Sequence, residues 1–220
     1  MKRAILLMNM GGPNNPDEVE LFLNNMFNDR RIIGAPRPIR MLIARLITWR
    51  RKEEARSNYA ALGGRSPIID YTRELIAALQ MRVDATVHMV MRYTPPFAGD
   101  VLKDLQDVDE IYAIPLYPHH SSTTTLSSMD DLETAIRLHG IKATLKTVSS
   151  YYRHPDYIRA IVERIKETLG EDDPSSFELV FSAHGLPQRL IDKGDDYQRH
   201  IRYTLYHVRR ALVHENIGFY

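Results

Sequence analysis

Short apolar runs that alternate with helical patterns constrain the fold of this chain more than any other feature of its sequence. Each run reads as a strand that is ended by loop-forming residues. Strand–helix alternation implies parallel pairing with right-handed crossovers, and strands that are apolar throughout fit a sheet with helices on both faces. The sequence therefore predicts an α/β fold with a doubly wound parallel sheet. The expected strands are residues 4–10, 85–91, 110–116, 143–149 and 177–183.

Several residues mark where the helices between these strands begin and end. Asn15 can cap a helix that has Pro16 at its first position. Gly140 and Gly170 come just after two helical stretches, where a left-handed residue is favoured. Further helices are expected over residues 38–61, 156–169 and 196–214.

Composition excludes several classes of protein. The chain has 220 residues and a formal net charge of +1, which gives no global attraction to nucleic acid or membrane. It has no cysteine, so disulfides, thiolate metal sites and a cysteine-ligated iron–sulfur cluster are excluded within the chain. No segment reaches the roughly 18 apolar residues that span a bilayer. Residues 1–8 lack the long apolar region and cleavage site of a signal peptide, so we expect a first buried strand and a cytoplasmic protein.

The run Ser182-Ala183-His184-Gly185 follows the last expected strand. His184 would thus lie at the carboxyl end of a strand, where ligands bind in open α/β sheets. A histidine there can accept a proton or bind a metal, and the alternative for a single histidine is a structural hydrogen bond.

Four other motifs precede this run in a fixed order. They are Leu-Met-Asn-Met-Gly-Gly-Pro at residues 7–13, Tyr59 with Gly-Gly-Arg-Ser-Pro-Ile at 63–68, Met-Arg-Tyr at 91–93 and Tyr-Pro-His-His-Ser-Ser-Thr-Thr at 117–124. Together with His184 they resemble the ferrochelatase family over essentially the whole chain. The resemblance implies an enzyme of the lyase class that inserts ferrous iron into protoporphyrin IX to give protohaem, the last step of haem biosynthesis.

The resemblance also implies a domain arrangement. The family has two similar doubly wound, Rossmann-like halves with the porphyrin cleft between them. The first half is expected over residues 1–149 and the second over residues 150–220. The second half would be short and incomplete, with one strand and two helices, because the family continues beyond Tyr220. We therefore expect a truncated chain whose activity is doubtful.

His184 carries the catalytic role that the resemblance implies. Metal insertion requires that two pyrrole protons leave and that a partly dehydrated metal is delivered. His184 would take the protons or bind the metal, and its usual glutamate partner has no counterpart here. No cofactor is expected, because ferrous iron is a substrate.

Five further residues of the first three motifs and their flanks are implied to bind porphyrin. Met10 would contact the macrocycle, since a thioether suits an aromatic ring, or would be a core residue. Arg51 and Tyr59 would reach the propionates and the cleft wall. Arg92 would bind propionate or metal next to Tyr93, or would be a salt-bridged surface residue.

Two more porphyrin contacts are implied in the hydroxyl-rich motif, at His120 and Ser121. His119 and His120 are adjacent and would point apart, which favours one histidine in the cleft over a metal site made of two.

Residues 37–51 form a basic amphipathic stretch. Apolar residues recur at helical spacing there, at Ile39, Leu42, Ile43, Leu46 and Ile47. The stretch is either a solvated helix over a core stripe or a lip that touches anionic membrane lipid, from which a peripheral membrane association would follow.

Other functions stay open beside protoporphyrin metalation. A coproporphyrin or cobalt chelatase of the same fold is one, and a porphyrin- or haem-binding module without catalysis is another. A phosphate- or nucleotide-binding protein is supported only by Gly11-Gly12 and the Ser/Thr loop, and no complete G-x-G-x-x-G pattern occurs. No nucleic-acid partner is expected.

Overall fold

The computed structural model describes residues 1–214 and 217, and the chain divides into two units. The first unit comprises Met1–Tyr117 and Ser122–Ser149, and the second comprises Pro118–Ser121 and the chain from Ser150 onward. The assignment of residues 1–149 and 150–220 to two chelatase halves stays a prediction.

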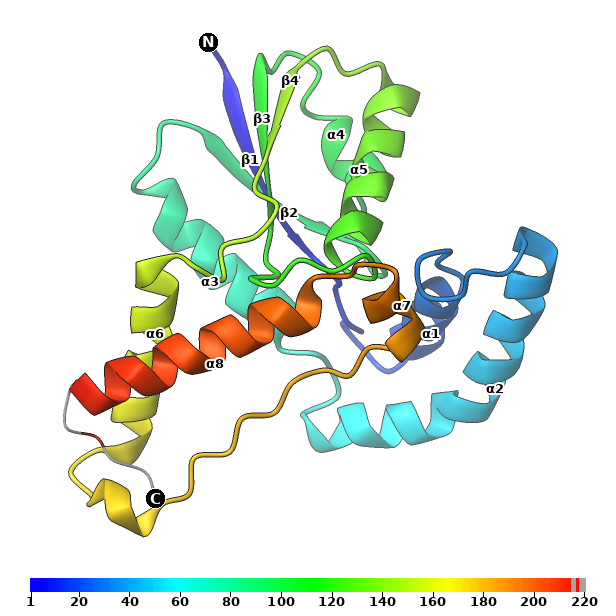
Figure 1. The fold of residues 1–220 in the computed structure, drawn as a ribbon. Coiled ribbons are helices and arrows are strands. Elements are labelled where there is room, and N and C mark those ends of the chain that lie inside the picture. Colours follow the sequence, from blue (N-terminus) through cyan, green and yellow to red (C-terminus); the bar gives the residue numbers. More distant parts are fainter. Residues whose placement is uncertain (215–216, 218–220) are drawn as a thin grey trace. The chain divides into compact units, whose positions relative to one another are not determined.

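A four-stranded parallel sheet forms the centre of the first unit (Figure 1). The strand order is β2-β1-β3-β4, with Ala4 of β1 paired to Thr86 of β2 and to Ile111 of β3. The strands are β1 (Arg3–Asn9), β2 (Thr86–Met91), β3 (Glu110–Pro115) and β4 (Thr144–Thr147). Four of the expected strands and their parallel pairing are therefore confirmed, and the predicted α/β fold with them. The chain leaves β1 toward β2 and then crosses back to β3, so the strand order reverses beside β1, where open α/β sheets bind ligands.

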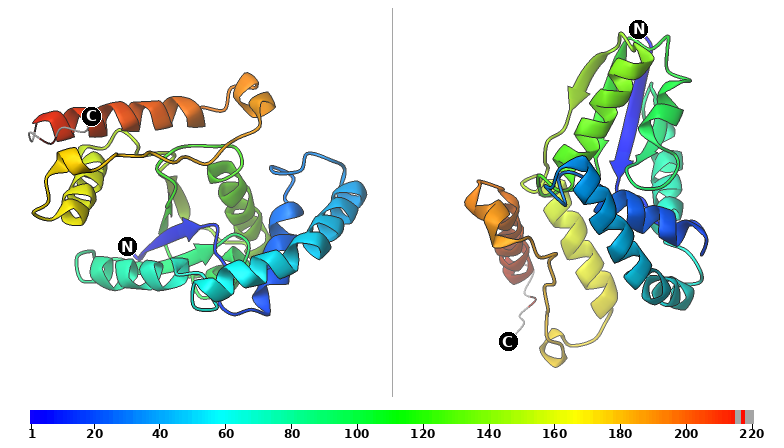
Figure 2. Two further views of the ribbon diagram at one scale, coloured as in Figure 1. Left: turned by 90° about the horizontal axis from the view of Figure 1, so that it is seen from below. Right: turned by 90° about the vertical axis from the view of Figure 1, so that its right-hand side faces the viewer.

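Helices join the strands and close the core of the first unit (Figures 1 and 2). They are α1 (Glu18–Phe27), α2 (Arg37–Ala61), α3 (Ile68–Gln80), α4 (Ala98–Leu102) and α5 (Thr125–His139). The main core lies between β1, β3, α4 and α5, where Leu6, Leu102, Ile111 and Leu132 are fully buried. Burying an aliphatic side chain of this size contributes roughly 1.5–3 kcal/mol relative to leaving it in water.

In the described part of the second unit, all regular secondary structure is helical. It contains α6 (Pro155–Leu169), a 3₁₀ turn (Pro174–Ser176), α7 (Gln188–Asp192) and α8 (Tyr197–His214). Ile158 and Val162 of α6 pack against Val208 and Leu212 of α8.

The strand expected over residues 177–183 is wrong. This segment has no regular secondary structure, and Val180 is 75% exposed. The physical reason is that a strand needs a neighbour for its backbone hydrogen bonds, and the described part of the second unit holds no other strand. Only Leu179 of the apolar run contacts the α6–α8 core.

The predicted helix boundaries are mostly confirmed. The helices expected at 38–61, 156–169 and 196–214 correspond to α2, α6 and α8. Gly140 closes α5 in the left-handed region with φ 63°, and Gly170 follows α6 with φ 59°. Asn15 lies outside α1, which begins later than expected, but its Oδ1 accepts hydrogen bonds from the backbone N–H groups of Asp17 and Glu18 at 3.0 and 3.1 Å. Among the described residues, none of the helices combines the length and apolarity needed to cross a membrane.

Candidate functional site

The ends of β1 and β2 hold two of the motifs side by side. The backbone N–H of Arg92 donates to the carbonyl of Asn9, and that of Tyr93 donates to the carbonyl of Met10, both at 2.9 Å. Met10 and Tyr93 are therefore fixed next to each other at the carboxyl end of the sheet, as the parallel pairing of the strands requires.

The glycine-rich motifs also meet there. The backbone N–H of Ser66 donates to the carbonyl of Pro13 at 2.8 Å, which joins residues 63–68 to residues 7–13. Gly11 has φ 81°, and a Cβ at this position would collide with the side chain of Thr94. Thr94 Oγ1 in turn accepts from the N–H of Gly12 at 3.1 Å. Gly11 and Gly12 thus let the segment that carries them lie close to other segments of the same chain, at Thr94 and Ser66.

An apolar cluster forms around Tyr93. Met10 and Tyr59 pack against buried residues of α1 and against Tyr93, whose ring meets Phe22 edge to face at 6.2 Å between ring centroids. Burial raises the pKa of the Tyr59 hydroxyl. The structure thus brings Met10, Tyr59 and Tyr93 together. Met10 is only partly buried, so its burial fits both a core residue and a residue that contacts a ligand.

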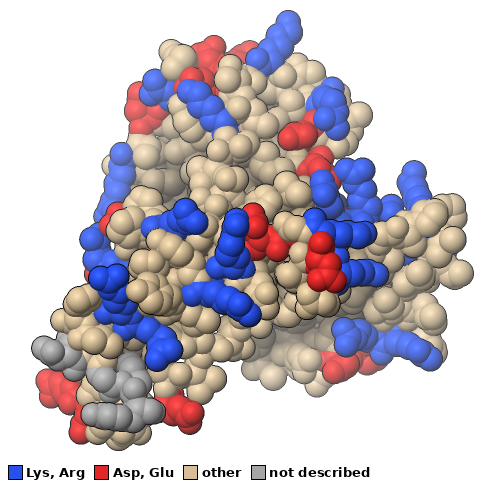
Figure 3. Space-filling view, viewed as in Figure 1, with Lys and Arg blue, Asp and Glu red and all other residues tan. Residues whose placement is uncertain are grey.

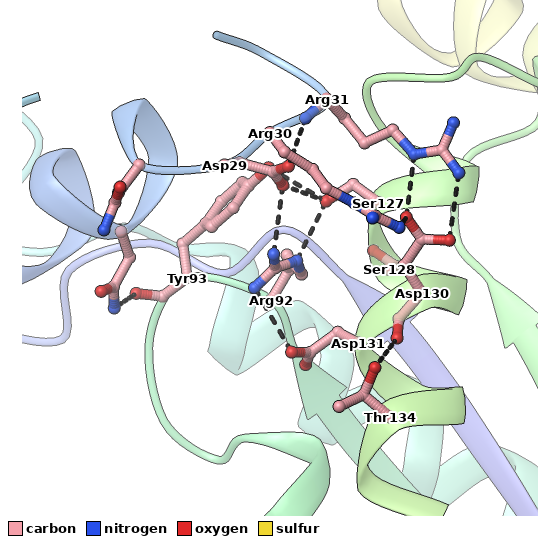
Figure 4. Close-up of polar contacts among 12 residues, drawn as sticks. Asp29, Arg30, Arg31, Arg92, Tyr93, Ser127, Ser128, Asp130, Asp131 and Thr134 are labelled. Atoms are coloured by element: carbon pink, nitrogen blue, oxygen red, sulfur yellow. Dashed lines mark hydrogen bonds and ion pairs between the residues drawn. The ribbon is translucent and has the colours of Figure 1, made fainter. Parts of the chain in front are cut away.

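Arg92 lies at the centre of a polar network (Figure 4). Its Nε donates to Ser127 Oγ at 2.9 Å, its Nη2 donates to Asp29 Oδ2 at 3.2 Å, and its Nη1 lies 3.5 Å from Asp131 Oδ1. Every nitrogen of the guanidinium therefore faces a protein oxygen, while 23% of the side chain stays exposed. The salt-bridged interpretation of Arg92 describes these contacts, and its contact with propionate or metal stays a prediction.

Asp29 is deeply buried in the network, with a side chain 1% exposed. It accepts hydrogen bonds from Tyr93 Oη at 2.9 Å, from Ser127 Oγ and from the backbone N–H of Arg31 at 2.7 Å. Burial and the neighbouring carboxylate of Asp29 raise the pKa of Tyr93, so this phenol keeps its proton at neutral pH. Neither Asp29 nor Ser127 was predicted from the sequence, because neither belongs to a motif and both are far from Arg92 along the chain.

A second carboxylate fastens the same loop to α5. Asp130 accepts from Arg31 Nε and Nη2 at 2.9 and 3.0 Å and from Arg30 Nη2 at 2.8 Å. The hydrogen bond from Arg31 holds the pKa of Asp130 below its usual range. A hollow of about 330 Å³ adjoins this network, and acidic and basic side chains both line it, so neither charge dominates.

Arg51 lies apart from this network, on the exposed surface of α2. Of the expected apolar stripe of α2, Leu42 is 70% exposed and Leu46 52%, whereas Ile43 and Ile47 are partly buried; the neighbouring Trp49 is 68% exposed. Figure 3 shows tan surface with blue side chains over α2, at the right of the view. Ala44 and Thr48 are the buried residues of α2. Both interpretations of this stretch, a solvated helix over a core stripe and a lip on membrane lipid, stay predictions.

The second unit holds the remaining site residues. The backbone N–H of His120 donates to His200 Nδ1 at 3.1 Å, and Ser121 Oγ donates to Asp195 Oδ2 at 3.0 Å. His184 is exposed, and its backbone meets the hydroxyl of Tyr197. Within residues 1–214 and 217, no three His, Cys, Asp or Glu side chains are grouped so that they could hold a metal, so a metal-binding role for His184 stays a prediction.

His119 is held separately from His120. Its Nε2 is 3.0 Å from Thr204 Oγ1, and its ring meets Tyr157 and Tyr197 edge to face. Burial, with a smaller contribution from His200, lowers the pKa of His119 to about 4, so the ring is neutral at physiological pH.

Comparison with known proteins gives one consistent result. The family model described as Ferrochelatase matches residues 2–219. The chain is 50% identical over 204 residues to a ferrochelatase from a Nitratiruptor species, covering 91% of the chain and 66% of that relative. Relatives of the same name from Sulfurimonas denitrificans and Campylobacter fetus subsp. fetus are 44% and 43% identical, covering 99% and 100% of the chain and 71% of each relative. The chain thus spans 66% to 71% of the length of these three relatives.

Proposed function

Since the chain belongs to the ferrochelatase family, we propose that it acts in haem synthesis and inserts ferrous iron into protoporphyrin IX. The products are protohaem and two protons. One observation carries the proposal: residues 7–13, 63–68 and 91–93, far apart in sequence, are hydrogen-bonded to one another at the carboxyl end of the sheet. This is where an α/β fold binds its ligand.

In this proposal, different side chains contact different parts of the porphyrin. Met10 and Tyr59 supply apolar wall for a flat macrocycle, which needs a wide apolar surface with few polar anchors. Arg51 has an exposed guanidinium, which is suited to a propionate carboxylate. His120 and Ser121 complete the contacts to porphyrin.

His184 takes the pyrrole protons or binds the metal. Its exposure leaves the imidazole accessible to a ligand. Tyr93 is unsuited to the role of base, because its raised pKa keeps the phenol protonated. No resident cofactor enters the reaction, since ferrous iron is consumed as a substrate.

We also propose that α2 touches an anionic membrane surface from the cytoplasm. Leu42, Leu46 and Trp49 expose apolar surface on a helix that also carries Arg45 and Arg50. Apolar side chains flanked by arginines favour binding at a lipid interface. Such a contact would bring the protein to a membrane-soluble porphyrin.

A fluorescence titration with protoporphyrin IX, followed by zinc as an oxidation-safe substitute for ferrous iron, tests the proposal. We expect saturable binding and then the emission of zinc porphyrin. Parallel titrations with coproporphyrin III, and with cobalt as the metal, separate the related chelatases. A protein that binds no porphyrin would refute the proposal.

A second candidate, porphyrin binding without catalysis, is favoured by the isolation of His184. Among the described residues it belongs to no group of three His, Cys, Asp or Glu side chains that could hold a metal, whereas metal affinity usually comes from several ligands. Binding of porphyrin without insertion of zinc would support this candidate.

A further inference from the structure

Asp29 is a buried carboxylate on which four hydrogen-bond donors converge, and the proposed contacts with porphyrin do not use it. We propose that Asp29 is a positioning residue that fixes the orientation of Arg92 and Tyr93 for porphyrin metalation. This inference rests on the proposed function and adds to it a residue outside every motif of the sequence.

The contacts of Asp29 divide between its two oxygens. Oδ1 accepts from the backbone N–H of Arg31 at 2.7 Å, which fixes the carboxylate to its own loop. Oδ2 accepts from Tyr93 Oη at 2.9 Å, from Arg92 Nη2 at 3.2 Å and from Ser127 Oγ. One oxygen therefore anchors the carboxylate, and the other orients the side chains at the end of β2.

Stability alone does not account for this arrangement. Burying a carboxylate costs several kcal/mol unless it is paired and hydrogen-bonded, and well-packed apolar residues of similar volume often stabilise a protein as well as an ion pair. A fully bonded buried carboxylate does impose a single geometry on its partners. A buried charge in a place where apolar packing would be as stable is a local departure of the kind expected at functional sites.

The three nitrogens of the Arg92 guanidinium are held at unequal distances. Ser127 and Asp29 hold Nε and Nη2 at hydrogen-bond distance, so the plane of the guanidinium is set by two contacts. Nη1 has the longest contact, 3.5 Å to Asp131, whose side chain is 33% exposed. Arg92 and Asp131 both line the hollow of about 330 Å³ described above. By holding Nη2, Asp29 thus helps to set the direction in which Nη1 points.

Asp130 offers a matched control in the same network. It binds Arg30 and Arg31 at distances as short as those around Asp29, and its contacts do not include Arg92 or Tyr93. Figure 4 shows the two carboxylates on opposite sides of Ser127. Replacing either aspartate by asparagine removes one charge and loosens the same loop.

The decisive experiment compares Asp29→Asn with Asp130→Asn in the full chain. In Asp29→Asn, Oδ1 is still needed by the N–H of Arg31, so the new amide N–H₂ faces the donors of Arg92. We expect both variants to melt at lower temperature. We expect Asp29→Asn to slow zinc insertion into protoporphyrin by roughly tenfold to a hundredfold, as misplaced reacting groups do. Asp130→Asn should stay within about twofold of the parent, because its partners contact neither Arg92 nor Tyr93.

A double-mutant cycle tests whether Asp29 acts through its partners. In a chain that already carries Arg92→Gln and Tyr93→Phe, Asp29→Asn should have little further effect on the rate of insertion, since its targets are gone. Equal slowing by Asp29→Asn and Asp130→Asn, or an undiminished effect of Asp29→Asn in the doubly substituted chain, would overturn the proposal.

A spectroscopic arm separates failure of this inference from failure of the proposed function. Arg92 Nε donates to Ser127 Oγ, which itself donates to Asp29. The Nε–H signal of Arg92 in a ¹⁵N spectrum should therefore be protected from solvent exchange in the parent and in Asp130→Asn, and should lose protection in Asp29→Asn. A parent that binds no porphyrin would refute the proposed function, and the Nε–H signals would still report whether Asp29 orients Arg92. Unchanged protection in Asp29→Asn would refute the positioning role even in an active enzyme.

Discussion

Arg31 and Asp130 form a two-pronged ion pair, in which Nε and Nη2 donate to the two carboxylate oxygens at 2.9 and 3.0 Å. The pair joins the loop after α1 to the first turns of α5, residues 99 positions apart in the sequence. Two parallel hydrogen bonds fix the relative orientation of their partners better than a single contact does. The loop that carries Asp29 is held against α5 in this way.

Replacing Asp130 with Asn should lower the free energy of unfolding at neutral pH by about 1 kcal/mol or less, because both partners are partly exposed. The bond from Arg31 lowers the pKa of Asp130 in the folded state. The stabilisation is therefore present above the ordinary aspartate pKa of about 4 and is lost as the pH falls through the lower folded value.

Urea unfolding of the parent and of Asp130→Asn across this pH range checks the prediction. The control is Asp100→Asn, which breaks an exposed pair with Lys103. A difference between the parent and Asp130→Asn that does not shrink as the pH falls below the ordinary aspartate pKa of about 4 would contradict the assignment.

Replacing His184 with Ala should abolish insertion of zinc and leave the affinity for porphyrin nearly unchanged. The histidine lies on an exposed extended segment, so the melting temperature should change little. His214→Ala, at an exposed position at the end of α8, is the control for loss of an imidazole. Equal insertion rates in His184→Ala and the parent would remove His184 from the mechanism.

Replacing Gly11 with Ala should destabilise the first unit by at least about 2 kcal/mol. The left-handed backbone alone costs a non-glycine residue roughly 1–2 kcal/mol, and the added methyl would also collide with Thr94. Gly34 is the matched control, since a Cβ there meets no atom within 4 Å. Thermal unfolding should show a lower melting temperature for Gly11→Ala only, and similar effects at both positions would contradict the role given to Gly11.

The second unit should lose stability as the pH falls from about 6.5 to about 4. The pKa of His119 drops from 6.5 to about 4 on folding, so in this interval the unfolded chain binds a proton that the folded chain does not. His119→Gln should be less stable than the parent at about pH 7.5, because it loses the ring contacts with Tyr157 and Tyr197. Its disadvantage should shrink toward about pH 4.5. A difference in the free energy of unfolding between the parent and His119→Gln that is the same at both pH values would contradict this prediction.

The sequence was sufficient for β1, β2 and β3, because their buried positions leave clear apolar runs, whereas β4 is mostly exposed and was predicted from its place in the strand–helix alternation. It was misleading for residues 177–183, which have the same pattern. Whether such a run becomes a strand depends on a neighbour to pair with, and the described part of the second unit provides none. For the stripe on α2, helical spacing shows where apolar side chains gather and not what covers them, so the two interpretations of that helix stayed open.

The polar network around Arg92 lies beyond what a single sequence reveals. Asp29 and Arg92 are 63 positions apart, and Arg92 and Ser127 are 35 apart. Their contact depends on how three connections pack at the end of the sheet. Motifs predicted Met10, Tyr59, Arg92 and Tyr93 as neighbours, and the structure brings Met10, Tyr59 and Tyr93 into one cluster with Arg92 beside it. Nothing in the sequence around Asp29 or Ser127 indicates that their side chains hold Arg92.

The central position of β1 also affects how the chain is made. Ala4 cannot find its partner Thr86 until the ribosome has added 82 more residues, and its other partner, Ile111, follows later still. At synthesis rates of roughly 5–20 residues per second, the nascent apolar strand waits about 4 to 16 seconds for its first neighbour. During that time α1, α2 and α3 can form, since helices need only local contacts. Synthesis of this chain therefore leaves β1, its most buried strand, without a partner for longer than the strands that follow it.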